Sequence, residues 1–150
     1  MFRKRLALGL TQLLKLSGLE AKRTTAIGYC FGGTGVLELA RSGADVAGVV
    51  SFHGGLGSPT PADAKRIKAK VLVCHGADDP YVPDAEVAAF KKEMRDGGVD
   101  WQLIYYSDAV HAFTQKMAGN DKSKGAAYDA KADARSWAHM KQFFVEALAE

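Results

Sequence analysis

A short glycine-rich run, Gly28-Tyr29-Cys30-Phe31-Gly32, has the Gly-x-nucleophile-x-Gly pattern of a nucleophile elbow. In such a sharp turn between a strand and a helix, side chains two positions before and after the nucleophile would collide, which explains Gly28 and Gly32. The turn places the Cys30 sulfur at the N-terminus of the helix, where unpaired backbone N–H groups favour the reactive thiolate form. The backbone N–H of Phe31 is then a donor for an oxyanion hole. The spacing therefore predicts a nucleophilic cysteine.

Two other interpretations of this run stay open. A lone cysteine is usually a small buried apolar side chain, and Cys30 with its glycines would then serve close packing. A glycine-rich turn after a strand can also bind a dinucleotide. Against that reading, Cys30 occupies the place of the second glycine of the fingerprint, and no acidic residue ends the next predicted strand. We therefore favour the nucleophile.

Two polar residues further along the chain complete a three-part site. Asp79, in the turn before Pro80, is a candidate acid, and we prefer it to Asp78, which we expect to face solvent or to cap the turn. His111 lies in a loop and is a candidate base. Alone, each would more often be an ordinary turn or loop residue. Together with Cys30 they follow the chain order nucleophile, acid, histidine, in which the base activates the nucleophile and the acid orients the base.

Apolar runs of strand length alternate with amphipathic stretches, and this alternation predicts the fold. We expect strands over 24–29, 46–52, 70–76 and 101–106, and helices over 1–16, 31–41, 62–69, 84–97 and 128–148. Strands that are apolar throughout are typical of a parallel sheet covered by helices on both faces. The chain is thus expected to be one α/β domain, residues 1–150, with a three-layer arrangement around a parallel sheet of about four strands. The last helix is expected to bury Ala130, Ala134, Trp137, Phe144 and Leu148.

The composition restricts the class of protein. With 150 residues, 47% of them hydrophobic and 25% charged, the chain is in the range of a folded globular domain. Its net charge of +3 is spread over the predicted helices, so nucleic acid is not an expected partner. No apolar run approaches the ~20 residues that span a bilayer, so no membrane association is expected. Two cysteines form neither a disulfide framework nor a metal site, so we expect a cytoplasmic protein without metal or cofactor.

Four segments, taken together, resemble the dienelactone hydrolase family of the α/β-hydrolase superfamily. They are residues 28–33 (Gly-Tyr-Cys-Phe-Gly-Gly), 51–54 (Ser-Phe-His-Gly), 75–80 (His-Gly-Ala-Asp-Asp-Pro) and 111–113 (His-Ala-Phe). The resemblance implies an α/β-hydrolase fold and a triad of Cys30, Asp79 and His111. It also implies that the substrate is an ester or a lactone and that no cofactor takes part.

The same resemblance implies two differences from the family pattern. Members begin with further strands, one of which brings a second oxyanion-hole donor, and we find no counterpart of these strands in this sequence. Relatives that act on the dianionic dienelactone carry an arginine shortly after the histidine, where this chain has Thr114 and Gln115. We therefore expect hydrolysis of a small ester or lactone through an acyl-enzyme. The alternative is a truncated, catalytically weak homologue that acts as a binding or assembly module.

The strand expected over 24–29 has a free edge. In the implied fold it pairs with 46–52 on one side and with one of those earlier strands on the other, so its outer side has no partner in this sequence. It carries no inward charge or proline that would blunt the edge. Together with the apolar face of the helix over 1–16, this edge predicts a homo-oligomer, most simply a dimer.

Overall fold

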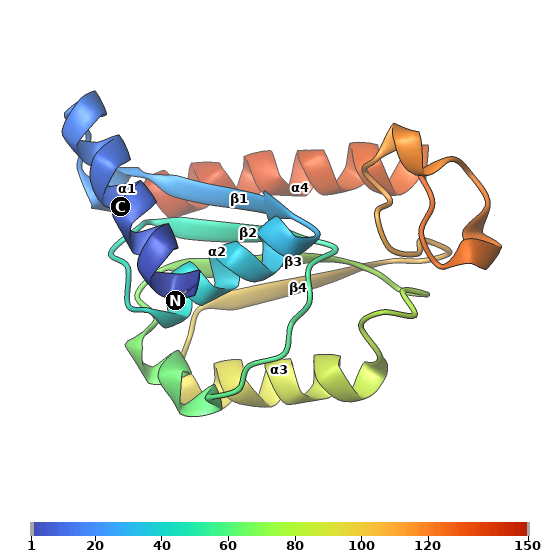
Figure 1. Ribbon diagram of the computed structural model, residues 1–150, viewed down its shortest axis with the longest axis horizontal. Helices are drawn as coiled ribbons and strands as arrows, with labels where there is room; N and C mark the ends of the chain where they lie inside the picture. The colour runs from blue at the N-terminus through green and yellow to red at the C-terminus, as the bar shows by residue number, and fades with distance from the viewer. Residues whose placement is uncertain (1, 150) are drawn as a thin grey trace.

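A computed structural model describes residues 2–149, and its centre is a parallel sheet of four strands in the order β1-β2-β3-β4 (Figure 1). The strands are β1 (Thr25–Tyr29), β2 (Gly48–Phe52), β3 (Lys70–Gly76) and β4 (Trp101–Tyr106). Each lies within the range that the sequence predicts for it. The α/β fold with about four parallel strands is therefore confirmed.

Helices cover both faces of this sheet. They are α1 (Phe2–Ser17), α2 (Phe31–Arg41), α3 (Asp84–Gly97) and α4 (Ala130–Leu148). The ribbon shows three layers, because α2 and α3 pack on one face and α4 on the other, while α1 lies against α2 (Figure 1). In place of the helix expected over 62–69, the chain forms a 3-10 helix at Pro61–Arg66. It ends early because the chain must become extended before β3 begins.

The apolar strands divide into two cores, because successive residues of a strand point to opposite faces of the sheet. Val49 and Val71 pack under α2 and α3, whereas Val50 and Leu72 pack under α4. All four are fully buried. This burial on both faces is the physical reason for the continuous apolar runs in the sequence.

The prediction for the buried face of α4 is wrong. The residues that face the sheet are Ala132, Ser136, Met140, Phe143 and Ala147. Of the five residues expected to be buried, Phe144 alone packs in part against the core, while Trp137 is 47% exposed. Both stripes repeat at helical spacing, so the pattern does not choose between them. Packing against the sheet decides which stripe is buried. The observed stripe contains small side chains and can approach the sheet closely. It packs over Gly48, where a Cβ would lie 2.9 Å from the Phe143 ring.

In the described part of the chain β1 is an edge strand, and Ile27 at its centre is 42% exposed. We expect the chain to form a homodimer that covers this edge, since an apolar strand with unpaired backbone groups is a template for another chain. Sedimentation at micromolar concentration measures the assembly. Ile27→Lys should favour the monomer, whereas Met117→Lys, at an exposed loop position, should leave the dimer intact. A wild-type protein that sediments as a monomer would contradict the prediction.

Candidate active site

Cys30 occupies a strained turn between β1 and α2. Its φ of 52° and ψ of −119° are rare for a residue with a side chain. A Cβ at Gly28 would lie 1.9 Å from the carbonyl oxygen of Gly32, so the turn requires glycine at 28. A Cβ at Gly32 would meet nothing within 4 Å, whereas one at Gly33 would lie 2.9 Å from the Cα of Gly54. The elbow has the predicted form, but the second glycine that its packing requires is Gly33, and the collision expected at Gly32 is wrong.

Three polar side chains meet at the carboxyl ends of the strands. His111 Nε2 lies 3.2 Å from Cys30 Sγ, and His111 Nδ1 lies 2.8 Å from Asp79 Oδ2. Cys30 follows β1, Asp79 follows β3 and His111 follows β4. Because parallel strands end at the same edge of the sheet, residues far apart in the chain come together there. The structure thus brings the three residues together, while Asp78 is exposed to solvent.

Asp79 is held as a carboxylate in a buried turn. Its Oδ1 accepts a hydrogen bond of 2.9 Å from the Tyr81 backbone N–H, and its Oδ2 faces His111. Burial opposes ionisation, but the hydrogen bonds from His111 and Tyr81 outweigh it and hold the pKa of Asp79 below its usual value. The carboxylate can therefore orient the His111 ring with Nδ1–H donating toward it, which leaves Nε2 facing the sulfur.

The pairing with Asp79 also changes the titration of His111. The hydrogen bond to Asp79 raises the pKa of His111 to about 9, against the effect of burial, and Cys30 adds to the rise. At neutral pH the ring therefore holds a proton between a carboxylate and a sulfur. Such a group can return that proton to a leaving alcohol.

We expect the His111 ring to titrate near pH 9 in NMR spectra, and Asp79→Asn to move the midpoint toward the ordinary value of 6.5. Because the folded-state pKa is the higher one, the stabilisation from this pair is complete below about pH 6.5 and is lost as the pH rises through about 9. Asp79→Asn should therefore lower the free energy of unfolding more in mildly acidic than in alkaline buffer. Asp78→Asn is the matched control. A wild-type midpoint near 6.5 would speak against the pairing.

His53, to which the sequence assigns no role in the site, packs directly against it. It follows β2 with a φ of 39° and is fully buried. Its Nε2 is hydrogen-bonded to Thr114 Oγ1 at 2.8 Å, and its ring centroid lies 5.2 Å from that of His111. Burial lowers the pKa of His53 to about 4, with the charge of His111 adding to the effect, so the ring is neutral at physiological pH. His53 therefore supports the loop that carries His111. Its place at the end of a buried strand, before Gly54, is the sequence signal for this role.

The two cysteines lie in different environments. Cys74 is fully buried in β3, and burial raises its pKa to about 12, whereas Cys30 is partly exposed at the elbow. We expect iodoacetamide to modify Cys30 in the folded protein and to leave Cys74 unmodified, because alkylation requires an accessible thiolate. Peptide mapping by mass spectrometry measures both sites, and a Cys30→Ser variant should take up no label before it unfolds. Preferential labelling of Cys74 would remove the basis for this site.

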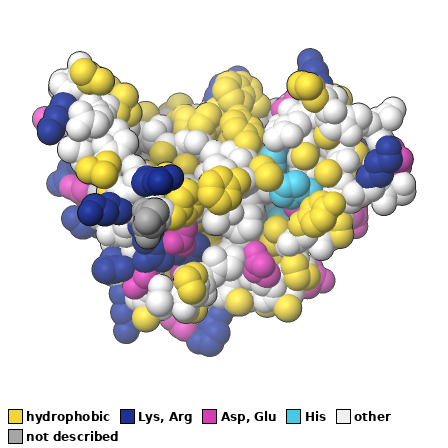
Figure 2. Space-filling view, in the orientation of Figure 1, with side chains coloured by type: hydrophobic (Ala, Val, Ile, Leu, Met, Phe, Trp, Pro, Cys, Tyr) yellow, Lys and Arg dark blue, Asp and Glu magenta, His cyan; other side chains and the backbone are white. Residues whose placement is uncertain are grey.

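On the face of the molecule that carries the elbow, histidine atoms reach the surface among hydrophobic side chains (Figure 2). Within residues 2–149, no group of three or more His, Cys, Asp or Glu side chains is arranged to hold a metal ion. No helix in the same range is both long and apolar enough to cross a membrane.

Comparisons with known proteins bear on the family and the fold of this chain. The model of the dienelactone hydrolase family matches residues 3–148. The crystal structure of P91, a dienelactone hydrolase-like promiscuous phosphotriesterase from metagenomic libraries, is similar with a TM-score of 0.90 and 46% identity over 97% of this chain and 61% of that one. Protein K02A2.1 of Caenorhabditis elegans is 33% identical over 97% of this chain and 93% of its own length.

The chain spans only part of some relatives. Protein usf of Aquifex pyrophilus is 30% identical over 85% of this chain but only 52% of its own length. The region matched by the family model, residues 3–148, includes the elbow, the turn that carries Asp79 and the loop that carries His111. On the strength of the family match over nearly its whole length, this chain belongs to the dienelactone hydrolase family.

Proposed function

We propose that the protein hydrolyses a small carboxylic ester or lactone with Cys30 as nucleophile, His111 as general acid and base, and Asp79 as the residue that orients His111. The observation that carries the proposal is the continuous contact from Cys30 Sγ to His111 Nε2 at 3.2 Å and from His111 Nδ1 to Asp79 Oδ2 at 2.8 Å. Nucleophile, base and orienting acid in hydrogen-bonding sequence are the arrangement that covalent acyl transfer requires. Membership of the family supports this class of reaction.

The first half of the reaction forms an acyl-enzyme. In the starting state His111 already holds the proton of the Cys30 thiol, and the resulting thiolate attacks the carbonyl carbon, so that a C–S bond forms and the carbonyl electrons move to oxygen. Phe31 is the first residue of α2, so its backbone N–H has no partner within the helix and can donate to this oxyanion. The C–O bond then breaks, and the imidazolium of His111 protonates the departing alkoxide.

The second half returns the enzyme to its starting state. His111 removes a proton from water, and the resulting hydroxide attacks the thioester carbon. Breaking the C–S bond releases the carboxylic acid, and the Cys30 sulfur leaves as a thiolate beside the protonated His111. From a lactone, the alcohol and the acid are the two ends of one product. No step requires a metal or an organic cofactor.

The test is the turnover of p-nitrophenyl acetate by the purified chain beside a Cys30→Ala variant. Wild-type turnover that the variant lacks supports the proposal, and equal rates in the two refute it.

Phosphotriester hydrolysis is a second candidate, and the 46% identity with P91 favours it. The same thiolate would attack phosphorus instead of carbon and expel an aryloxide, with the same residues in the same roles. Turnover of paraoxon that disappears in Cys30→Ala together with the esterase activity would assign both reactions to one site.

A binding or assembly module is the alternative to an enzyme. In that case the Cys30–His111–Asp79 arrangement would be retained without turnover. The p-nitrophenyl acetate assay distinguishes this candidate from the hydrolase, since a folded wild-type chain without activity would favour the module.

A further inference from the structure

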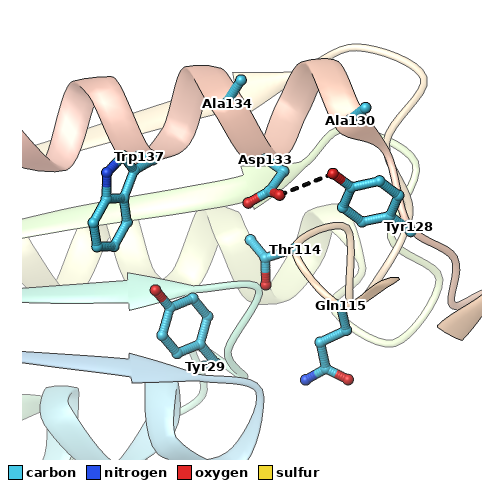
Figure 3. Close-up of a pocket in the computed structure, with 8 residues that line it drawn as sticks. All are labelled: Tyr29, Thr114, Gln115, Tyr128, Ala130, Asp133, Ala134 and Trp137. Carbon is cyan, nitrogen blue, oxygen red and sulfur yellow. Dashed lines mark hydrogen bonds between the residues drawn. The ribbon is translucent and has the colours of Figure 1, made fainter. Parts of the chain in front are cut away.

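An open pocket of about 710 Å³ lies beside the triad, between the end of β1, the loop after His111 and the first half of α4 (Figure 3). Tyr29, which directly precedes Cys30, and Thr114, which is bonded to His53, both line it. A molecule whose reacting group lies at Cys30 thus has this pocket next to it. None of the reaction steps described above uses it.

Aromatic side chains form much of the pocket wall. Trp137 and Tyr29 come from α4 and β1 and extend toward the same space, with Tyr128 at the far end (Figure 3). Tyr29 is held in place by stacking on Phe52, with ring centroids 4.6 Å apart. Trp137 is 47% exposed, so much of its ring is open to a ligand in the pocket. An exposed aromatic cluster of this kind at a pocket indicates a binding surface.

The charge of the pocket is negative. Asp133 is the one charged residue among those that line it, and its carboxylate points into the space between Trp137 and Tyr128 (Figure 3). It accepts a hydrogen bond of 3.1 Å from the Tyr128 hydroxyl, and among the described residues no lysine or arginine pairs with it. Burial raises the pKa of Tyr29, and the negative charge of Asp133 adds to that rise. The charge of the Asp133 carboxylate thus acts on a side chain at the opposite wall of the pocket.

Asp133 is not needed to cap α4. That role belongs to Asp129, whose side chain accepts hydrogen bonds from the backbone N–H groups of Lys131 and Ala132 at 3.1 and 2.9 Å. Asp129 is also paired with Lys122 at 3.0 Å. The helix therefore has a side-chain cap without Asp133, whose charge in the first turn also favours the helix dipole. Neither role requires the carboxylate to lie among aromatic side chains.

We propose that this pocket binds an organic ammonium group, quaternary or protonated, carried by the part of the substrate remote from the reacting carbonyl. Aromatic faces attract a cation through their quadrupole, and a nearby carboxylate adds a Coulomb attraction that the partly enclosed site screens less than bulk water does. The same carboxylate repels an anionic substrate. The proposal deepens the proposed function, since it names the class of ester, but binding in the pocket does not itself require turnover.

The binding test uses a Cys30→Ala, Trp101→Phe protein, so that Trp137 is the one remaining tryptophan of the two in the chain and no turnover occurs. Benzyltrimethylammonium should change the Trp137 fluorescence saturably, and phenylacetate should not bind. Asp133→Asn should lower the affinity for benzyltrimethylammonium about tenfold. Glu146→Gln, which makes the same charge change at an exposed position of the same helix, should leave the affinity unchanged. Absence of cation binding by the folded protein, equal affinity for the anion, or an unchanged affinity in Asp133→Asn would overturn the proposal.

A kinetic test separates this inference from the proposed function. In the wild-type protein kcat/KM is compared for acetylcholine and for 3,3-dimethylbutyl acetate, its uncharged analogue. Asp133→Asn should lower kcat/KM for acetylcholine about tenfold and leave kcat/KM for 3,3-dimethylbutyl acetate unchanged. Hydrolysis of both esters without a preference would refute the cation site and leave the hydrolase standing. Cation binding without hydrolysis of any ester would support the cation site and refute the proposed hydrolase.

Discussion

Replacing His111 with alanine should lower ester turnover by about 10²–10⁴-fold, the usual contribution of a positioned acid–base group. The expectation follows from the position of His111 between the Cys30 sulfur and the Asp79 carboxylate. Without the imidazole, no group is placed to take the Cys30 proton or to protonate the leaving alcohol. The His111 side chain is 14% exposed and lies against the His53 and Tyr81 rings, so p-nitrophenyl acetate turnover is compared only after the variant is shown to be folded.

The matched control is His139→Ala, which makes the same change on α4, where His139 Nδ1 contacts the Tyr106 hydroxyl at 2.9 Å. It should keep turnover within a few-fold of wild type, and thermal unfolding verifies that both variants fold. Near-full activity in His111→Ala would mean that another residue is the base. His53 is the histidine packed closest to the site, but it is buried, bonded to Thr114 and has a pKa of about 4, so we expect it to act only as support.

The largest effect on stability is expected at Arg41, a fully buried cation in α2. Its Nε and Nη2 donate to the two carboxylate oxygens of Glu93 at 2.9 and 2.7 Å, and Nη2 also donates to the Leu56 carbonyl at 2.8 Å. Arg41→Met leaves the Glu93 carboxylate buried without its partner. Breaking a buried ion pair in this way costs about 3–5 kcal/mol of unfolding free energy. Urea denaturation measures the loss.

A double replacement tests the reason for that loss. In Arg41→Met with Glu93→Leu no charge is left buried without a partner, because Glu38, which also contacts Arg41, keeps its ion pair with Arg3. The protein should therefore recover most of the stability that Arg41→Met alone loses. Arg66→Met, at an exposed arginine paired with Asp63, serves as control and should change the free energy of unfolding by less than about 1 kcal/mol. If the double variant were as unstable as the single one, the cost would come from lost packing and not from an unpaired charge.

The contact between Arg41, Glu93 and Leu56 also bears on the site. Leu56 lies in the loop that follows His53, and Glu86 of α3 accepts hydrogen bonds from the Leu56 and Gly57 N–H groups at 2.6 and 2.8 Å. Buried polar groups on α2 and α3 thus hold the start of the loop after β2. Since His53 contacts His111, this loop is one of the supports of the triad.

The sequence alone determined the elements and the identity of the elbow, because both depend on local properties. The apolar run of β3 and the glycine-bounded helix α2 have the bounds that the pattern predicts. The elbow is recognisable because a strained backbone at Cys30 requires glycine at Gly28, a constraint that acts within five residues. The order nucleophile, acid, histidine also made Asp79 and His111 the candidate acid and base, and the structure places both at the edge where the parallel strands end.

Only the tertiary structure decided which face of each helix packs against the sheet. α4 has two adjacent stripes at helical spacing, and the choice between them depends on contacts with strands far earlier in the chain, such as Phe143 over Gly48, 95 positions apart. The same choice turned Trp137 and Asp133 away from the sheet and toward Tyr29, which forms the pocket beside the triad. Likewise, the bond between His53 and Thr114 joins residues 61 positions apart. Periodicity gives the spacing of residues along one element, whereas the partner of each face depends on how closely two surfaces can pack.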